Sequence, residues 1–399
     1  MGAKYIRLLL LLIAFWTSSA FLHTPSLLAA GTGALGNTEE KVQAQLGSID
    51  LSKVQGFINQ VDQETSGYFP QLDLGNLLSN LKAGKIDFRP QAFFAGIFKL
   101  LFREVEASAG LMAKLVALAV LCGILQHLQN SFEGSVSKVA QAMSYLVLIT
   151  LALASLTLAV NTGKKAIDDM VGFMQALLPV LLTLLVALGN LTTAAIFHPF
   201  IISALSFIST IIKDIVLPLV FLGAILAVVN QISDHIKVSK LASLLDFASK
   251  AVLGLSLTLF IGIMTVEGVA GSISDGVALR SAKFATDAFV PVVGRWFSDA
   301  IELVVGSALL LKNAIGLVGI IVILLLCLLP VIKIISIMLI YRLASALVQP
   351  LGNASLADAL QAMSSSLTLV FACVASVAIM FFMAVSIILA TGNLTVMLR

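Results

Sequence analysis

Residues 313–332 read NAIGLVGIIVILLLCLLPVI, and this run of twenty positions carries no charged residue. An α-helix of that length rises about 30 Å, which matches the hydrocarbon core of a lipid bilayer. Similar runs recur through the second half and much of the first half of the chain. Together they predict an all-α polytopic membrane protein. The apolar windows lie at 110–128, 139–160, 171–190, 195–213, 215–232, 251–270, 313–332, 333–349 and 367–390.

Composition supports the same fold class. Of the 399 residues, 59% are hydrophobic and only 11% are charged, whereas a typical soluble domain has about 25% charged residues. So few charges cannot cover the surface of a water-soluble protein. The net charge of +3 is too small to indicate a polyanionic partner. Soluble enzymes, nucleic-acid-binding proteins and disordered regulators are therefore excluded.

The first 30 residues have the features of a secretory signal peptide. Lys4 and Arg7 precede the short apolar run 8–16, and small residues follow at 18–20 and again at 29–30. This apolar run is shorter than the ~20 residues that a membrane span needs. We therefore expect cleavage after Ala20 or Ala30 and an extracytoplasmic location for residues 31–109.

The segment that follows is modestly polar. Residues 31–90 are expected to form short helices and turns, with one helix starting near Ser52. In residues 91–109, Phe94, Ile97, Phe98 and Leu101 recur at helical spacing, which predicts an amphipathic helix in the membrane interface. The same pattern also fits a helix that docks a partner protein. A multi-span membrane domain would then occupy residues 110–399.

Prolines and short motifs indicate an internal repeat. Pro179 and Pro291 are separated by 112 residues, as are Pro218 and Pro330, and Ala-Ser-Leu-x-Asp recurs at the same offset. This predicts a duplication covering roughly 168–270 and 280–390. The four prolines are candidate helix breaks, so that some helices would be kinked or re-entrant. Duplicated halves with broken helices are a recurrent plan of permeases.

A few charges lie near or within the apolar block. Arg295, Asp299 and Glu302 fall within about 60° of one another on a helix of 100° per residue. This stripe either lines a polar cavity or lies in the membrane interface, and the two alternatives are evenly matched. Glu267 and Arg342 are the deepest other charges, and they could pair across the repeat interface. These five residues are the candidate polar path.

Signatures of chemistry are missing from the sequence. It contains neither a P-loop nor the HExxH and GxSxG motifs, and its four histidines and three cysteines show no metal-ligand spacing. We expect no catalytic residues, no metal and no cofactor. A transport process that consumed ATP would need an ATPase from another chain. Catalysis by this chain is therefore not expected.

Four short motifs carry a family resemblance. Residues 173–179 (FMQALLP), 280–283 (RSAK), 289–294 (FVPVVG) and 311–316 (LKNAIG) closely resemble the stage III sporulation protein AE family of endospore-forming Firmicutes. The resemblance covers the whole chain and is least specific in its amino-terminal segment. It implies a protein of the mother-cell membrane around the forespore. Implied partners are a secretion-type ATPase and ring-forming proteins of the same operon, with a forespore membrane protein. No catalytic or ligand residues are carried over.

Three functions are compatible with these features. The leading hypothesis is a permease-like component of a channel complex between mother cell and forespore, needed for late forespore gene expression. The second is a membrane anchor that seats the ring and the ATPase and conducts nothing, docking them through amphipathic helices. The third is a secondary transporter that acts alone.

Overall fold

The computed structural model describes residues 51–66, 90–131, 135–232, 237–289, 294–351 and 354–397, and the structural statements below concern these residues. They belong to one compact unit, Ile49–Arg399. Nearly all of them are helical, and this part of the chain contains no β-strand. The expected all-α fold is therefore confirmed. The predicted signal peptide, residues 1–30, lies outside the described residues.

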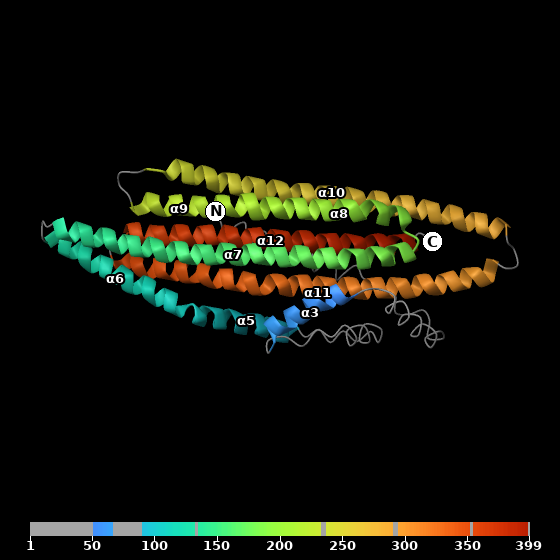
Figure 1. Cartoon of the computed structure of the whole chain (residues 1–399), viewed down its shortest axis with the longest axis horizontal. Helices are drawn as coiled ribbons and strands as arrows, with labels where there is room; N and C mark the ends of the chain where they lie inside the picture. Colours follow the sequence, from blue (N-terminus) through green and yellow to red (C-terminus); the bar gives the residue numbers. More distant parts are fainter. Residues whose placement is uncertain are drawn as a thin grey trace. The chain divides into compact units, whose positions relative to one another are not determined.

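Figure 1 shows the described helices in chain order. In chain order they are α3 (Ser52–Thr65), α5 (Pro90–Ala107), α6 (Ala109–Ser131), α7 (Ser135–Ala187), α8 (Leu191–Ile211), the π-helix η2 (Ile212–Val216), α9 (Leu217–Ile232), α10 (Ser239–Phe289), α11 (Gly294–Val348), the 3-10 helix η3 (Gln349–Leu351) and α12 (Ala354–Met397).

Five of the described helical segments are long and apolar enough to cross a membrane. We conclude that the chain is a multi-pass membrane protein. The five segments are Leu146–Ala187, Leu191–Gln231, Ser239–Val266, Gly306–Val348 and Ala354–Thr391.

Several apolar windows of the sequence lie in pairs on one continuous helix. Windows 139–160 and 171–190 are both in α7, and windows 313–332 and 333–349 are both in α11. A charged residue interrupts a hydropathy window, but lysine and aspartate are tolerated inside a helix and do not end it. With 53 residues, α7 is about 80 Å long, well beyond the ~30 Å hydrocarbon core of a bilayer.

The polar helix α3 packs beside the middle of α7. Its Phe57 ring meets the ring of Phe173 edge to face, with 5.7 Å between the centroids. Val54, Ile58 and Val61 are buried in this contact, as their helical spacing requires. The opposite side of α3 exposes Lys53 and Glu64. Such a helix is stable only in contact with water or headgroups. The predicted helix start near Ser52 is confirmed.

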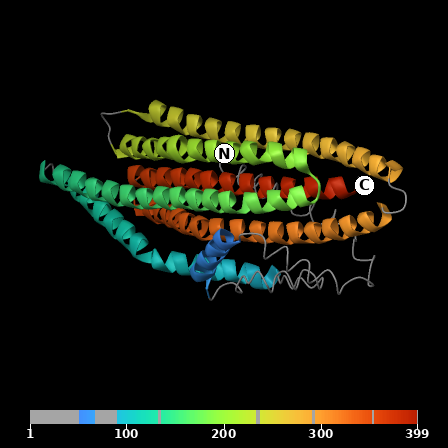
Figure 2. The same ribbon diagram turned by 45° about the vertical axis from the view of Figure 1, so that its right-hand side comes forward.

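Helix α12 occupies the centre of the bundle. It packs against α7, α9, α10 and α11, and both views place it between these helices (Figures 1 and 2). A helix enclosed by neighbours is apolar all round, because no face of it meets solvent. Buried residues of α12 include Leu367, Val370, Cys373, Val374, Val377, Met380 and Phe381.

Helix α5 covers residues predicted to be amphipathic, but its buried side is not the predicted stripe. Leu100 is buried, whereas Phe94, Phe98 and Phe102 are exposed at 60%, 59% and 71%. Helix α5 contacts α6 and α11. The three phenylalanines, at i, i+4 and i+8, therefore form an apolar outer face, named here the Phe face. Its location in the membrane interface stays a prediction.

The prolines are placed differently from one another. Helices α7 and α11 continue through Pro179 and Pro330 without ending. Pro218 comes directly after the π-helix η2, where the N–H of Leu217 bonds the Ile212 carbonyl. Proline lacks the N–H that the helix would use next, which favours this irregular segment. Pro291 lies outside the described residues, and the internal repeat stays a prediction.

Close helix contacts depend on two glycines of α11. A Cβ on Gly316 would overlap the side chain of Leu389 on α12, and one on Gly319 would overlap Leu177 on α7. We expect Gly316→Ala to lower stability by about 1–3 kcal/mol, because the whole Leu389 side chain must move in a packed interface. Thermal unfolding in detergent micelles measures the change.

The matched control is Gly306→Ala on the same helix, where a Cβ meets nothing within 4 Å. This variant is expected to unfold at the wild-type temperature or slightly above it, since alanine is the better helix former. Equal unfolding temperatures for both variants would show that the approach of α11 to α12 does not depend on Gly316.

Candidate functional site: a buried polar cluster at the α7–α8 turn

The five residues of the candidate polar path do not form one site. Arg295, Asp299 and Glu302 lie in the first turns of α11, and Glu267 lies on α10; the side chains of these four are outside the described residues. Arg342 is exposed near the other end of α11. Its separation from Arg295 is about 70 Å along the helix, so Arg342 cannot belong to the predicted stripe.

Glu267 and Arg342 lie at different heights along the bundle. Tyr341 bonds Ser155 in the first half of α7, whereas Asp275 of α10 binds α8 just after the C-terminal end of α7. Glu267 is only two turns from Asp275. At 1.5 Å per residue, the two charges are more than about 30 Å apart along the bundle. The stripe at 295–302 itself stays a prediction.

Buried polar groups gather instead where α7 turns into α8. Several buried hydroxyls elsewhere in the described chain bond a carbonyl in their own helix, as Ser336 and Ser249 do. The buried charged residues and Asn190 are different, because they lie close to the α7–α8 turn. We define the polar cluster as Asn190, Thr193, Asp275, Ser307, Lys312 and Thr391, all of them buried.

The turn itself requires glycine. Gly189 has φ 86°, in the left-handed region that only glycine adopts without strain. The Asn190 N–H bonds the Leu185 carbonyl at 3.1 Å, which closes the end of α7. Leu188 is buried against Ala308 and Leu309 of α11 and so fixes the turn to the bundle.

Asp275 caps α8 from another helix. Its Oδ1 accepts the Thr192 N–H at 3.0 Å and its Oδ2 accepts the Thr193 N–H at 2.9 Å. Asn190 holds the N-cap position of α8, but its side chain makes no capping bond. The Asp275 carboxylate, 2% exposed, therefore supplies the acceptor and also lies at the positive end of the α8 dipole.

Lys312 is the second charge of the polar cluster. Lys312 is 0% exposed, and its Nζ donates to the Leu389 carbonyl on α12 at 2.8 Å. Lys312 is one turn beyond Ala308, which packs on Leu188. Thr391 is two residues from Leu389, and its hydroxyl donates to the Ile388 carbonyl at 2.9 Å. The cluster thus joins α8, α10, α11 and α12 around the end of α7.

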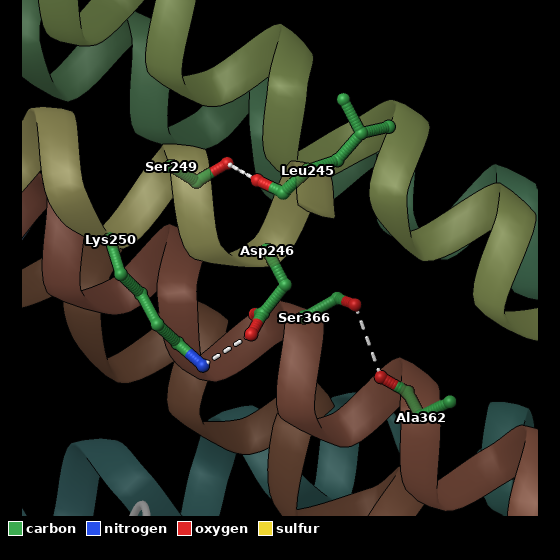
Figure 3. Close-up of polar contacts among 6 residues, drawn as sticks. All are labelled: Leu245, Asp246, Ser249, Lys250, Ala362 and Ser366. Atoms are coloured by element: carbon green, nitrogen blue, oxygen red, sulfur yellow. Dashed lines mark hydrogen bonds and ion pairs between the residues drawn. The ribbon is translucent and has the colours of Figure 1, made fainter. Parts of the chain in front are cut away.

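A second, exposed group of charges lies halfway along α7. Lys213 of η2 donates to Asp168 at 2.7 Å, and the Asp168 side chain is 56% exposed. Lys213 and Asp214 lie inside a continuous helical segment. Figure 3 shows a comparable surface pair, Asp246 and Lys250, one turn apart on α10 at 2.6 Å and beside α12. These pairs are exposed and contribute little stability.

Sequence reasoning missed the central residues of the polar cluster. Asp275 is surrounded by other polar residues in the sequence, so its charge did not stand out. Lys312 borders an apolar window and resembled an end-of-helix lysine. The available signal was that both residues lie in or at the edge of the stretch 275–316 that carries the family resemblance.

This arrangement holds oriented charges and amides inside an apolar bundle. Oriented groups of this kind can recognise polar or ionic species. The class defined by fold and site is a multi-pass helical membrane protein with a buried polar cluster.

Comparison with known proteins gives the family. The model of the family Stage III sporulation protein AE matches residues 72–392, which include the whole polar cluster. Stage III sporulation protein AE of Bacillus subtilis (strain 168) is 39% identical over 362 residues, covering 90% of this chain and 90% of that protein. No solved structure matches. The chain belongs to the stage III sporulation protein AE family, whose role is in sporulation.

The cap by Asp275 yields a stability prediction. Asp275→Ala is expected to destabilise the protein by about 1–3 kcal/mol, because the amide N–H groups of Thr192 and Thr193 lose their acceptors. Asp246→Ala removes an exposed aspartate from a surface pair and is expected to cost about 0.5 kcal/mol or less. Thermal unfolding of both purified variants gives the comparison, and an equal effect would contradict the role of the cap.

Proposed function

We propose that this chain is the permease-like membrane component of a channel complex between mother cell and forespore, needed for sporulation and late forespore gene expression. It would act in the mother-cell membrane around the forespore, with residues 31–109 outside the cytoplasm. Its partners would be a secretion-type ATPase and ring-forming proteins of the stage III sporulation A operon, with a forespore membrane protein. The chain itself would catalyse no reaction.

The observation that carries the proposal is the burial of Lys312. A lysine inside an apolar membrane bundle is costly in free energy, so one that is retained there is a functional candidate. Its Nζ bonds the Leu389 carbonyl in the interface of α11 with α12. The predicted stripe at 295–302 begins the same helix, and Glu302 is about 15 Å from Lys312 along its axis. A polar path along this end of α11 is consistent with both the buried Lys312 and the predicted stripe.

Lys312→Met tests the proposal, because methionine keeps the length of the chain and removes the charge. In sporulating cells we expect spore formation to fall by at least an order of magnitude, while the amount of protein in the membrane and its unfolding temperature stay unchanged or rise. Removal of a buried charge for an apolar side chain of similar volume is often stabilising. Spore counts after heat treatment and unfolding in detergent give the two measurements.

Lys333→Met is the matched control, since Lys333 lies on the same helix and is only half-buried. It is expected to leave sporulation intact. Wild-type spore formation with Lys312→Met would contradict the proposed channel role and favour the role as a membrane anchor.

One observation favours the anchor as a second candidate. The Phe face of α5 is an apolar surface on a helix that also carries Lys99 and Arg103. Aromatic residues beside basic ones are frequent in protein interfaces. A platform could seat its partners on this face without conducting anything.

The double variant Phe98→Ser, Phe102→Ser tests this alternative. An anchor predicts that the ring proteins and the ATPase no longer co-purify with the chain from sporulating cells. Phe207→Ser on α8 is the control, because Phe207 is also exposed, at 68%, and lies far along the chain from α5. Unchanged co-purification in the double variant would exclude docking through the Phe face.

A further inference from the structure

Two side chains at the α7–α8 turn are buried without partners. Asn190 is 1% exposed, and both its Oδ1 and its Nδ2 lack a hydrogen bond among the described residues. Thr193 is likewise 1% exposed, and its Oγ1 is unbonded there as well. Leaving an amide and a hydroxyl unsatisfied in an apolar bundle costs stability. An occupant that binds the two oxygens, Asn190 Oδ1 and Thr193 Oγ1, would remove their part of that cost.

The same two residues adjoin a carboxylate. Thr193 donates its N–H to Asp275 Oδ2 at 2.9 Å, so the Thr193 hydroxyl belongs to a residue that already bonds this carboxylate. Asn190 is three positions earlier, at the N-cap, and positions i and i+3 lie on the same side of a helix. The Asn190 carbonyl already accepts the Ala194 N–H, which leaves the side-chain amide as its free polar group. Carboxylate, amide and hydroxyl oxygens are therefore all found at this turn.

The charge at this turn favours a cation. A helix N-terminus commonly attracts an anion, but here the carboxylate of Asp275 already holds that place and would repel a second one. Carboxylate, amide and hydroxyl oxygens are ligands that hard metal ions prefer. The C-terminal end of α7, three residues before Asn190, adds backbone carbonyls and the negative end of a helix dipole. One carboxylate matches a single positive charge.

Lys312 does not occupy this position. Its ammonium group binds the Leu389 carbonyl in the interface of α11 with α12, whereas Asp275 belongs to the interface of α10 with α8. Lys312 thus joins α11 to α12, whereas Asp275 joins α10 to α8. Among the described residues, no cationic side chain bonds the oxygens at the α7–α8 turn.

We propose that Asn190, Thr193 and Asp275 form a binding site for a monovalent metal cation, of the size of Na⁺, at the α7–α8 turn. The cation bonds the side-chain oxygens of Asn190 and Thr193 and one carboxylate oxygen of Asp275, while the carboxylate keeps its bonds to α8. The site goes beyond the proposed channel role and does not depend on it, because binding is measured on the purified chain.

The experiment is thermal unfolding of the full-length protein in detergent micelles, in NaCl, KCl, LiCl or choline chloride at equal ionic strength. Choline is too large for the site and serves as the reference. A saturable rise of about 5 °C is expected with the preferred metal cation, since binding to the folded state raises its stability. In Asn190→Leu and Thr193→Val, which leave the Asp275 cap in place, the midpoint concentration should increase by about tenfold or more.

Two further readouts separate a site from general effects. In choline chloride, Asn190→Leu and Thr193→Val should unfold at the wild-type temperature or above it, because each replaces an unsatisfied polar group with an apolar one. Ser209→Ala removes a buried hydroxyl that is also unbonded, farther along α8. It should keep the wild-type cation response.

Two results would overturn the proposal. An unfolding temperature that is the same in all four salts would mean that water alone occupies the turn. A cation response that persists unchanged in Asn190→Leu and Thr193→Val would place the cation elsewhere. Neither result bears on the Lys312 test of the channel role.

Discussion

Polar groups inside an apolar bundle must find their partners within the protein, and the rest of the structure depends on this constraint. The backbone meets it by forming helices of up to 55 residues, in which internal N–H and carbonyl groups bond one another except where a proline such as Pro330 removes a donor. Helix ends are the places where the constraint is hardest to meet, because the first N–H groups have no partner in their own helix. At the start of α8 the missing acceptor comes from Asp275 on α10. Fold and candidate site therefore have one physical origin.

The lengths of the helices bear on where the charged residues lie relative to the membrane. The apolar part of α7 is 42 residues long, about twice what one bilayer requires. Asp168 and Lys213 pair near its middle, and the polar helix α3 packs close by. Part of the bundle consequently extends beyond the hydrocarbon core. Exposed charges mark that boundary, while the buried charges Asp275 and Lys312 lie toward the end at the α7–α8 turn.

The candidate residues show where sequence reasoning succeeds and where it stops. Periodicity correctly predicted the helix that begins at Ser52 and the helix at 91–107, because local spacing and capping are encoded in adjacent residues. It did not predict that Leu100 rather than the aromatic stripe is buried in α5, since this depends on the contact with α11. Glu267 and Arg342 were selected because each lies well inside an apolar stretch of sequence. That position in the sequence does not specify where along the bundle axis a residue lies.

Sequence alone determined that the protein is an α-helical membrane protein. With 11% charged residues the chain cannot cover a water-exposed surface, and its apolar runs have the length of membrane-spanning helices. It also determined the family, through short motifs at 173–179 and within 280–316. Only the tertiary structure decided which polar residues meet. Asn190 and Asp275 are 85 positions apart, and nothing in either neighbourhood indicates the other. They come together because α8 begins inside the bundle and needs an acceptor that its own sequence does not supply.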